Sequence, residues 1–357
     1  DFCRAEKSAG APYSLTHANF FMSGLVGLAV KHTLGIPLVT TFHALGKVRR
    51  LHQGADDGFP IERLTIEEAL VAHSDRIVAE CPQDEEDIIK LYNGHSGRLT
   101  TVPCGFDPAE FFPMPRDEAR AALGLDRKTF SILQLGRLVP RKGIDNVIRA
   151  VAALKRDFGH PAKLYVVGGN SALPDERCTP EIGRLRSIAR ELNVADCVHF
   201  TGQRPRKDLR SFYAACDVFV TTPWYEPFGI TPLEAMACAR PVIGSAVGGI
   251  RSTVVHDKTG LLVPPKDPLA LAAGLHQLAA NSRRREALGT AGLVRARKLY
   301  TWANVVRALE AAYVDVVRAN SPRTAASRAR IRVRPRVIVP LLRPAHGGTG
   351  HRTDRGR

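Results

Sequence analysis

Short apolar runs alternate with amphipathic stretches along most of the chain. After residue 129 there are six such runs, at residues 131–136, 163–169, 197–202, 217–222, 241–245 and 260–265. Helical patterns separate them; the clearest covers residues 144–158. Strands that alternate with helices indicate a parallel sheet with right-handed crossovers. The six runs therefore predict one complete Rossmann-like sheet.

The part before residue 118 has the same rhythm but is shorter. Four runs are expected to be strands, at residues 13–17, 37–42, 75–80 and 99–103. A strand–helix–strand unit takes roughly 30 residues. We therefore expect a second parallel sheet that is incomplete, with two strands and their helices missing before Asp1.

These patterns divide the chain into four parts. We expect a partial N-terminal Rossmann-like domain over residues 1–117 and a complete one over 118–300. A helix over 301–320 is expected to pack back on the first domain, and 321–357 to form a disordered tail rich in arginine and proline. Residues 108–120, with three prolines in the first eight positions, are expected to form the linker between the domains.

Charge and composition narrow the classes of function. The net charge of +16 is concentrated, because residues 321–357 hold ten arginines and one acid. We interpret this tail as a solvated appendage, or as a segment that contacts acidic lipid headgroups or nucleic acid non-specifically. No apolar run is long enough to span a membrane, and because no charged-then-apolar segment stands at the start, no secretion signal is expected. Seven scattered cysteines without a CxxC pair indicate free thiols. We expect a cytoplasmic protein, with the tail allowing peripheral contact with the inner face of the membrane.

Residues 134–143, QLGRLVPRKG, follow the first strand of the second domain. Gly136 ends the strand, Arg137 follows it, and Lys142 precedes a helix. Two cations and a helix N-terminus at one strand end suit a pyrophosphate group. Such charges favour a leaving group that gains negative charge. The alternative is a solvent-exposed basic turn.

Residues 224–237, WYEPFGITPLEAMA, follow the fourth strand of that domain. Glu226 lies in a loop and Glu234 lies inside the next helix, so two carboxylates are available for sugar or ribose hydroxyls. The backbone at Phe228, Gly229 and Ile230 can approach a ligand closely. The alternatives are that Glu226 caps the helix and that Glu234 lies on a solvated face.

His43 ends a strand of the first domain and is expected to face the cleft between the domains. It can bond a sugar hydroxyl or position the reacting centre, or it can be purely structural. Lys47, Arg49 and Arg50 follow it, and they either attract a phosphorylated acceptor or are solvated. Residues 102–107, VPCGFD, are expected to form a turn and hinge.

Several other chemistries lack their motifs. The chain has no phosphate loop of the GxxxxGKS type, no HExxH and no GxSxG. No DxD metal clamp ends a strand, and no GxGxxG follows one. These absences disfavour a metal-dependent single-domain transferase and a nicotinamide enzyme.

The motifs resemble, in combination and in order, the retaining GT-B glycosyltransferases of family four. That group includes sucrose-phosphate synthases and mycothiol-type transferases. The resemblance runs from about His17 to Val317 and rests on HANFFMSG, TFHALG, VPCGFD, LGRLVPRKG, EPFGITPLE, GSAVGGI and TGLLVPP. It implies a GT-B fold with two facing Rossmann-like domains, the first on the acceptor side.

The resemblance also implies an activity, namely transfer of a hexosyl unit from a UDP- or GDP-sugar with retained configuration. The acceptor is open: a sugar, a sugar phosphate or a lipid-linked glycan. Arg137 and Lys142 would grip the diphosphate, so neither a metal nor another cofactor is expected. Glu226 would orient the donor sugar, Glu234 would bind the ribose, and His43 would lie near the sugar.

The start of the chain departs from the family pattern, because the usual first strand and glycine-rich loop are not there. A second hypothesis is therefore a non-catalytic sugar-nucleotide-binding fragment. A third, a nucleic-acid-binding protein, is motivated by the isoelectric point near 9.9. No recognised nucleic-acid module supports the third hypothesis.

Overall fold

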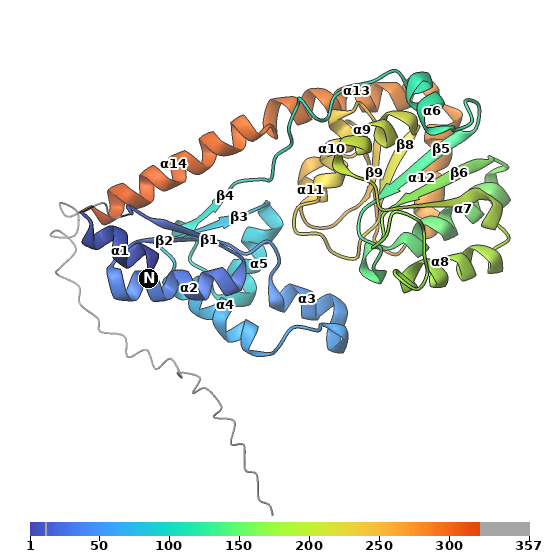
Figure 1. Ribbon diagram of the computed structural model, residues 1–357. Coiled ribbons are helices and arrows are strands. Elements are labelled where there is room, and N and C mark those ends of the chain that lie inside the picture. The colour runs from blue at the N-terminus through green and yellow to red at the C-terminus, as the bar shows by residue number, and fades with distance from the viewer. Residues whose placement is uncertain (11–12, 322–357) are drawn as a thin grey trace, which may run out of the picture. The chain divides into compact units, whose positions relative to one another are not determined.

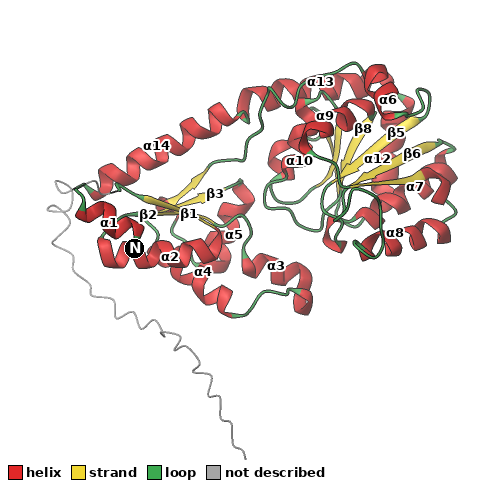
Figure 2. Cartoon of the chain, in the orientation of Figure 1, coloured by secondary structure: helices red, strands yellow, loops and turns green. Residues whose placement is uncertain are grey.

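Each apolar run expected to be a strand forms one in the computed structural model, which describes residues 1–10 and 13–321. All the pairings between these strands are parallel, and they make two sheets (Figures 1 and 2). Two sheets of α/β type agree with the fold class predicted from the alternating pattern.

The N-terminal lobe has a four-stranded sheet in the order β1-β2-β3-β4. Its strands are β1 (Thr16–Asn19), β2 (Leu38–Thr41), β3 (Arg76–Ala79) and β4 (Leu99–Thr101). Its helices are α1 (Phe2–Ser8), α2 (Phe20–Leu34), α3 (Gly46–Gln53), α4 (Glu62–His73) and α5 (Pro82–Tyr92), with short 3₁₀ turns η1 (Gly54–Asp56) and η2 (Ser96–Arg98). The first strand begins three residues later than expected, because its length is set by pairing with β2 from Thr16 to Asn19.

The C-terminal lobe has a six-stranded sheet in the order β10-β9-β8-β5-β6-β7. Its strands are β5 (Phe130–Leu135), β6 (Ala162–Val167), β7 (Val198–Gly202), β8 (Val218–Thr221), β9 (Val242–Ser245) and β10 (Gly260–Val263). Its helices are α6 (Arg116–Leu123), α7 (Ile144–Phe158), α8 (Pro180–Glu191), α9 (Arg206–Ala215), α10 (Ile230–Ala237), α11 (Ile250–Thr253), α12 (Pro268–Ala280) and α13 (Ser282–Leu299), with 3₁₀ turns η3 (Pro140–Lys142) and η4 (Ala195–Cys197).

Alternation along the strands divides the core of this lobe between two faces. Ile132 packs in a cluster with residues of α7, α8 and α12, whereas its neighbour Leu133 packs in a cluster with residues of α9 and α10. Successive side chains of a strand point to opposite faces of the sheet, so one strand contributes side chains to both clusters. A sheet covered on both faces leaves the ends of its strands as the accessible places for a ligand.

The chain passes between the lobes twice. The first crossing is shorter than the linker expected over residues 108–120. Helix α6 begins at Arg116, so residues 116–120 are helical. The return passage pairs with the first, because the Phe106 amide donates to the Tyr300 carbonyl (2.9 Å) and the Trp302 amide donates to the Phe106 carbonyl (3.2 Å). The segment expected to be a hinge is therefore bonded to the second crossing.

Helix α14 (Trp302–Asn320) follows the second crossing. Val305 and Val316 are buried in one cluster with Val39, Val78 and Val102 of the N-terminal lobe. Of the tail expected at 321–357, all but Ser321 lies outside the described residues. Within the described part of the chain, no helix combines the length and apolarity needed to cross a bilayer.

Candidate functional site

The loop from β5 to α7 is fastened to neighbouring strand ends by glycines. Gly136 has φ +147°, and a side chain on Gly168, after β6, would overlap the Gly136 carbonyl oxygen. Gly143 has φ +65°, and any side chain there would overlap the carbonyl oxygen of Thr222. The Thr222 hydroxyl also donates to the Gly143 carbonyl (2.9 Å). Only glycine allows such close approaches, so the loop that carries Lys142 is fixed against the end of β8.

Lys142 and Glu226 form an ion pair within this fixed loop arrangement. Both side chains are largely buried, with exposed fractions of 17% and 14%. Burial lowers the pKa of Lys142; Glu226 opposes this shift, and the charges of Arg141 and Arg137 add to it. The cations at 137 and 142 are therefore close enough to repel each other, and Glu226 lies directly against one of them.

Glu226 is not the cap of α10, which was one of its two expected roles. The N-cap position belongs to Gly229, and no side chain caps the helix. The backbone of the Glu226 loop is instead held by the loop after β9, where the Gly249 amide donates to the Glu226 carbonyl (3.2 Å). Side chains on Gly248 or Gly249 would overlap the carbonyl oxygens of Glu226 or Phe228. The glycine pair in AVGGI is the sequence signal for this support, and sequence reasoning gave it no role.

Glu234 does not lie on a solvated helix face, so that alternative is wrong. The residue is 3% exposed. Its carboxylate accepts hydrogen bonds from the Tyr213 hydroxyl (2.9 Å) and from the Arg206 guanidinium (3.1 Å). Burial raises the pKa of Glu234, while these two donors lower it. The carboxylate thus belongs to a polar network that is separate from the Lys142–Glu226 pair.

His43 lies at the carboxyl edge of the N-terminal sheet, between residues at the ends of two other strands. Its Nδ1 is 2.8 Å from Glu80 Oε1 and its Nε2 is 2.9 Å from Asn19 Oδ1. The backbone at His43 has φ +58°, which is uncommon outside glycine. The hydrogen bond to Glu80 raises the pKa of His43, although burial opposes it. Two oxygen partners favour the imidazolium form.

Sequence reasoning found His43 but not its two partners. Asn19 is the last residue of β1, and Glu80 directly follows β3. A polar residue immediately after a buried strand was the available signal, because carboxyl ends of parallel strands meet at one edge of a sheet.

We expect Glu80→Gln to lower the pKa of His43. The substitution removes the negative charge of Glu80 and replaces its carboxylate by a weaker amide acceptor, so both effects of Glu80 that raise the pKa decrease, while burial still lowers it. Because the folded-state pKa exceeds the unfolded value of 6.5, the pair stabilises the fold fully below pH 6.5. That contribution is lost as the pH rises through the folded-state pKa. An NMR titration of the His43 ring measures the shift directly.

Glu86→Gln is the matched control for this titration. Glu86 lies on the exposed side of α5 and pairs with Lys90 rather than with His43. An unchanged His43 pKa in Glu80→Gln, or an equal decrease in both variants, would show that Glu80 does not set the charge of this ring.

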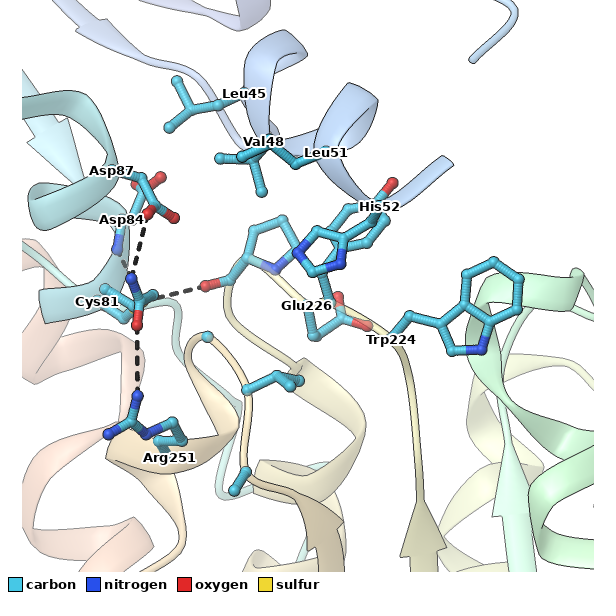
Figure 3. A pocket seen from close by; sticks show the side chains of 16 residues that line it. Leu45, Val48, Leu51, His52, Cys81, Asp84, Asp87, Trp224, Glu226 and Arg251 are labelled. Atoms are coloured by element: carbon cyan, nitrogen blue, oxygen red, sulfur yellow. Dashed lines mark hydrogen bonds between the residues drawn. The ribbon is translucent and has the colours of Figure 1, made fainter. Parts of the chain in front are cut away.

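A cavity of about 270 Å³ lies between the two lobes, and Glu226 lines it (Figure 3). From the N-terminal lobe the wall includes Leu45, Val48 and Leu51, together with Asp84 and Asp87. Loops 224–227 and 246–248 of the C-terminal lobe close the other side. The cavity therefore places Glu226, the partner of Lys142, beside residues of both lobes.

Hydrogen bonds between the lobes border the cavity. The Gln53 amide donates to the Tyr225 hydroxyl (2.7 Å), and the Cys81 thiol donates to the Pro227 carbonyl (3.3 Å). Burial raises the pKa of Cys81 to about 11, so its thiol keeps the proton at neutral pH. The loop that carries Glu226 is thus held by the N-terminal lobe as well as by its own.

The other predicted site residues differ in how far they are buried and in whether they line the cavity. The ring of Phe228 is buried in the core beneath the loop, and Gly229 has φ +92°. Ile230 begins α10 and is 41% exposed. Arg137 is exposed, and the residues that line the cavity include Glu226 but none of Arg137, Lys142, His43 and Glu234. The structure thus pairs Lys142 with Glu226 and places His43 and Glu234 in networks of their own.

The basic residues after His43 form helix α3 and are mostly paired. Lys47 forms a salt bridge with Glu68 (2.7 Å), and Arg49 forms one with Asp57 (2.7 Å). Neither cation is simply solvated, and neither lines the cavity.

Within residues 1–10 and 13–321, no group of three or more His, Cys, Asp or Glu side chains is arranged to hold a metal ion. The positive charge near the cavity comes from lysine and arginine side chains.

Two Rossmann-like lobes with a lined cavity between them define a GT-B glycosyltransferase fold. Two family models match the chain, Glycosyltransferase Family 4 over residues 4–110 and Glycosyl transferases group 1 over residues 115–295. The chain belongs to the group 1 glycosyltransferases, as the motif resemblance predicted.

Individual proteins agree with this assignment. The chain is 34% identical over 327 residues to a D-inositol 3-phosphate glycosyltransferase of Stackebrandtia nassauensis, which covers 90% of this chain and 73% of the relative. It is 33% identical to the sucrose-phosphate synthase of Thermosynechococcus elongatus, with a TM-score of 0.78 over 89% of this chain and 78% of the other. Anabaena HepE, solved with UDP and glucose, shares the fold at 22% identity and a TM-score of 0.72, over 86% of this chain and 79% of the other.

Proposed function

We propose that the protein transfers a hexosyl unit from a UDP- or GDP-sugar to an acceptor hydroxyl, with retention of configuration. One observation carries the proposal: Glu226 lines the interlobe cavity and forms a buried ion pair with Lys142, whose pKa also responds to the charge of Arg137. A diphosphate suits the two cations, and a sugar attached to it suits the carboxylate.

In the proposed reaction, the diphosphate replaces Glu226 as the partner of Lys142. The Glu226 carboxylate then becomes available to accept hydrogen bonds from hydroxyls of the donor sugar. The bond from the anomeric carbon to the phosphate oxygen breaks, and a bond to the acceptor oxygen forms on the same face. The acceptor proton passes to the departing phosphate oxygen. Arg137 and Lys142 stabilise the negative charge on that leaving group.

We assign supporting roles to the remaining site residues. The backbone amides around Phe228, Gly229 and Ile230 would hold the sugar or a phosphate, and His43 would position a sugar hydroxyl. We assign the ribose to Glu234. Because Arg206 is about half exposed, its contact with Glu234 can be exchanged for ribose hydroxyls at little cost.

A thermal-shift screen tests the donor. We expect a UDP- or GDP-sugar to raise the melting temperature, because a ligand at about 100 times its Kd stabilises the folded state by roughly 2.7 kcal/mol. UDP-glucose is the first donor to test, since Anabaena HepE was solved with UDP and glucose. Release of UDP or GDP with an acceptor measures transfer, and NMR of the product reports the anomeric configuration. An inverted product would contradict the retaining mechanism.

The alternative function, a non-catalytic sugar-nucleotide binder, predicts a different result in the same experiments. Donors would raise the melting temperature through Arg137 and Lys142, yet no nucleotide would be released with any acceptor. The names of the similar proteins, which are glycosyltransferases and a synthase, favour the enzyme.

A further inference from the structure

The wall of the interlobe cavity differs in charge between the lobes. Its side from the N-terminal lobe carries the aliphatic Leu45, Val48 and Leu51 and the carboxyl groups of Asp84 and Asp87, and includes no lysine or arginine (Figure 3). Positive charge lies on the other side, where Arg251 lines the cavity. The N-terminal wall therefore carries carboxyl groups alone, whereas the C-terminal wall carries one cation, Arg251, beside the Glu226 carboxylate.

None of the titratable groups of the N-terminal wall carries a positive charge near pH 7. Burial raises the pKa of Asp84 to about 7 and also raises the pKa of Asp87. His52 stacks on the Tyr225 ring at 5.0 Å, and burial lowers its pKa, so this imidazole is neutral near pH 7. The wall is neutral to negative at neutral pH.

The cations closest along the sequence, Lys47 and Arg49, are already paired with carboxylates, and the Arg49 guanidinium also donates to the Tyr225 hydroxyl of the other lobe (3.5 Å). Besides its bond with Glu68, the Lys47 ammonium lies 4.6 Å from the centre of the Tyr92 ring and donates to the Leu91 carbonyl (2.6 Å). Arg49 binds Asp57 through two nitrogens, at 3.0 and 2.7 Å. A phosphate would have to displace these carboxylates before it could recruit either cation.

Arg63 is buried within the N-terminal lobe and does not line the cavity. Its side chain is 1% exposed, pairs with Glu67 (2.7 Å), and lies against the rings of Phe20, Phe21 and Phe59 at 4.5–4.9 Å. Lys47, Arg49 and Arg63 are thus paired with carboxylates of this lobe, and Arg50 is not among the residues that line the cavity.

We propose that the acceptor is an uncharged glycoside with an apolar flank, not a phosphorylated sugar. Its hydroxyls would bond Asp87, Asp84 and Gln83, and its apolar part would pack on Leu45, Val48 and Leu51. A phosphomonoester would bring two negative charges against two carboxyl groups in a partly buried cavity, which is unfavourable. The inference rests on the proposed function and departs from the acceptor named for the relative from Stackebrandtia nassauensis, D-inositol 3-phosphate.

Competing acceptors test the inference. Octyl glucoside and D-inositol 3-phosphate are each supplied with the sugar nucleotide that gives the largest thermal shift, and kcat/KM is compared. We expect octyl glucoside to exceed the phosphate by at least ~10-fold, roughly the effect of one unfavourable charge contact in a partly buried site. A higher kcat/KM for D-inositol 3-phosphate overturns the inference, most clearly if Arg251→Gln abolishes that activity.

A charge-reversal pair sharpens the test. Asp87→Arg places a cation in the wall and is expected to raise kcat/KM for D-inositol 3-phosphate by ~10-fold or more. Glu86→Arg makes the same charge change one residue away, outside the cavity, and should leave the acceptor preference unaltered. An equal effect of both variants would point to long-range attraction and would contradict a specific role for the wall. The donor-induced thermal shift verifies that each variant is folded.

Direct binding separates this inference from the proposed function. Saturation-transfer NMR with octyl glucoside in the presence of UDP reports occupancy without turnover. Binding that is lost in Leu51→Asp supports the wall assignment even if no transfer occurs, in which case the proposed function fails and the acceptor class stands. Failure of octyl glucoside to bind, with UDP still bound, overturns the acceptor class alone.

Discussion

Lys142→Met is expected to reduce turnover of the sugar nucleotide by ~10²–10³-fold, equivalent to roughly 2.7–4 kcal/mol of transition-state stabilisation. The Lys142 amino group is held in place on a loop that glycines fix against β8, and its burial strengthens its interaction with a nearby negative charge. The diphosphate gains charge as the glycosidic bond breaks, so the loss should fall mainly on kcat. Methionine keeps most of the apolar stem.

Nucleotide release measures this effect, and Lys155→Met serves as the control. Lys155 is exposed near the end of α7, in the same lobe, and its replacement should leave turnover unaltered. Comparable turnover in Lys142→Met and the wild type would remove the central support for the proposed reaction.

Glu226→Gln is expected to lower turnover to a similar degree while UDP binds at least as tightly as in the wild type. In the native protein, the Glu226 carboxylate forms an ion pair with the Lys142 ammonium, so a diphosphate must compete with Glu226 for Lys142. The amide of glutamine removes that competing charge, which favours the nucleotide. The same change weakens the hydrogen bonds that orient the sugar, so the reacting carbon is no longer held in position.

Calorimetric UDP titration and nucleotide release together test this expectation. Glu191→Gln, an exposed carboxylate at the end of α8, is the control. In the double variant Lys142→Met/Glu226→Gln, the two losses should not add, because the residues are in direct contact. A large loss of UDP affinity in Glu226→Gln would mean that the carboxylate supports the nucleotide rather than competing with it.

The sequence determined the architecture because periodicity is a local property. Buried parallel strands appear as short apolar runs, and the helix predicted over residues 144–158 is found as Ile144–Phe158. The ends of strands were less certain, as for β1, because pairing with a neighbour sets them. Polar residues just beyond strand ends, such as His43 and Arg137, were also recognisable, since parallel topology brings strand ends to one edge.

Only the tertiary structure decided which of these residues are partners. Lys142 and Glu226 are 84 residues apart, and neither local pattern records that their loops meet. The same holds for Glu80 beside His43, and for Glu68 and Asp57, which pair with Lys47 and Arg49 of α3. Spacing along a chain specifies which residues share a face or an edge. Burial and pairing of charges depend on how separate elements pack. In this protein they determine which lysine and arginine side chains can bind an anionic ligand.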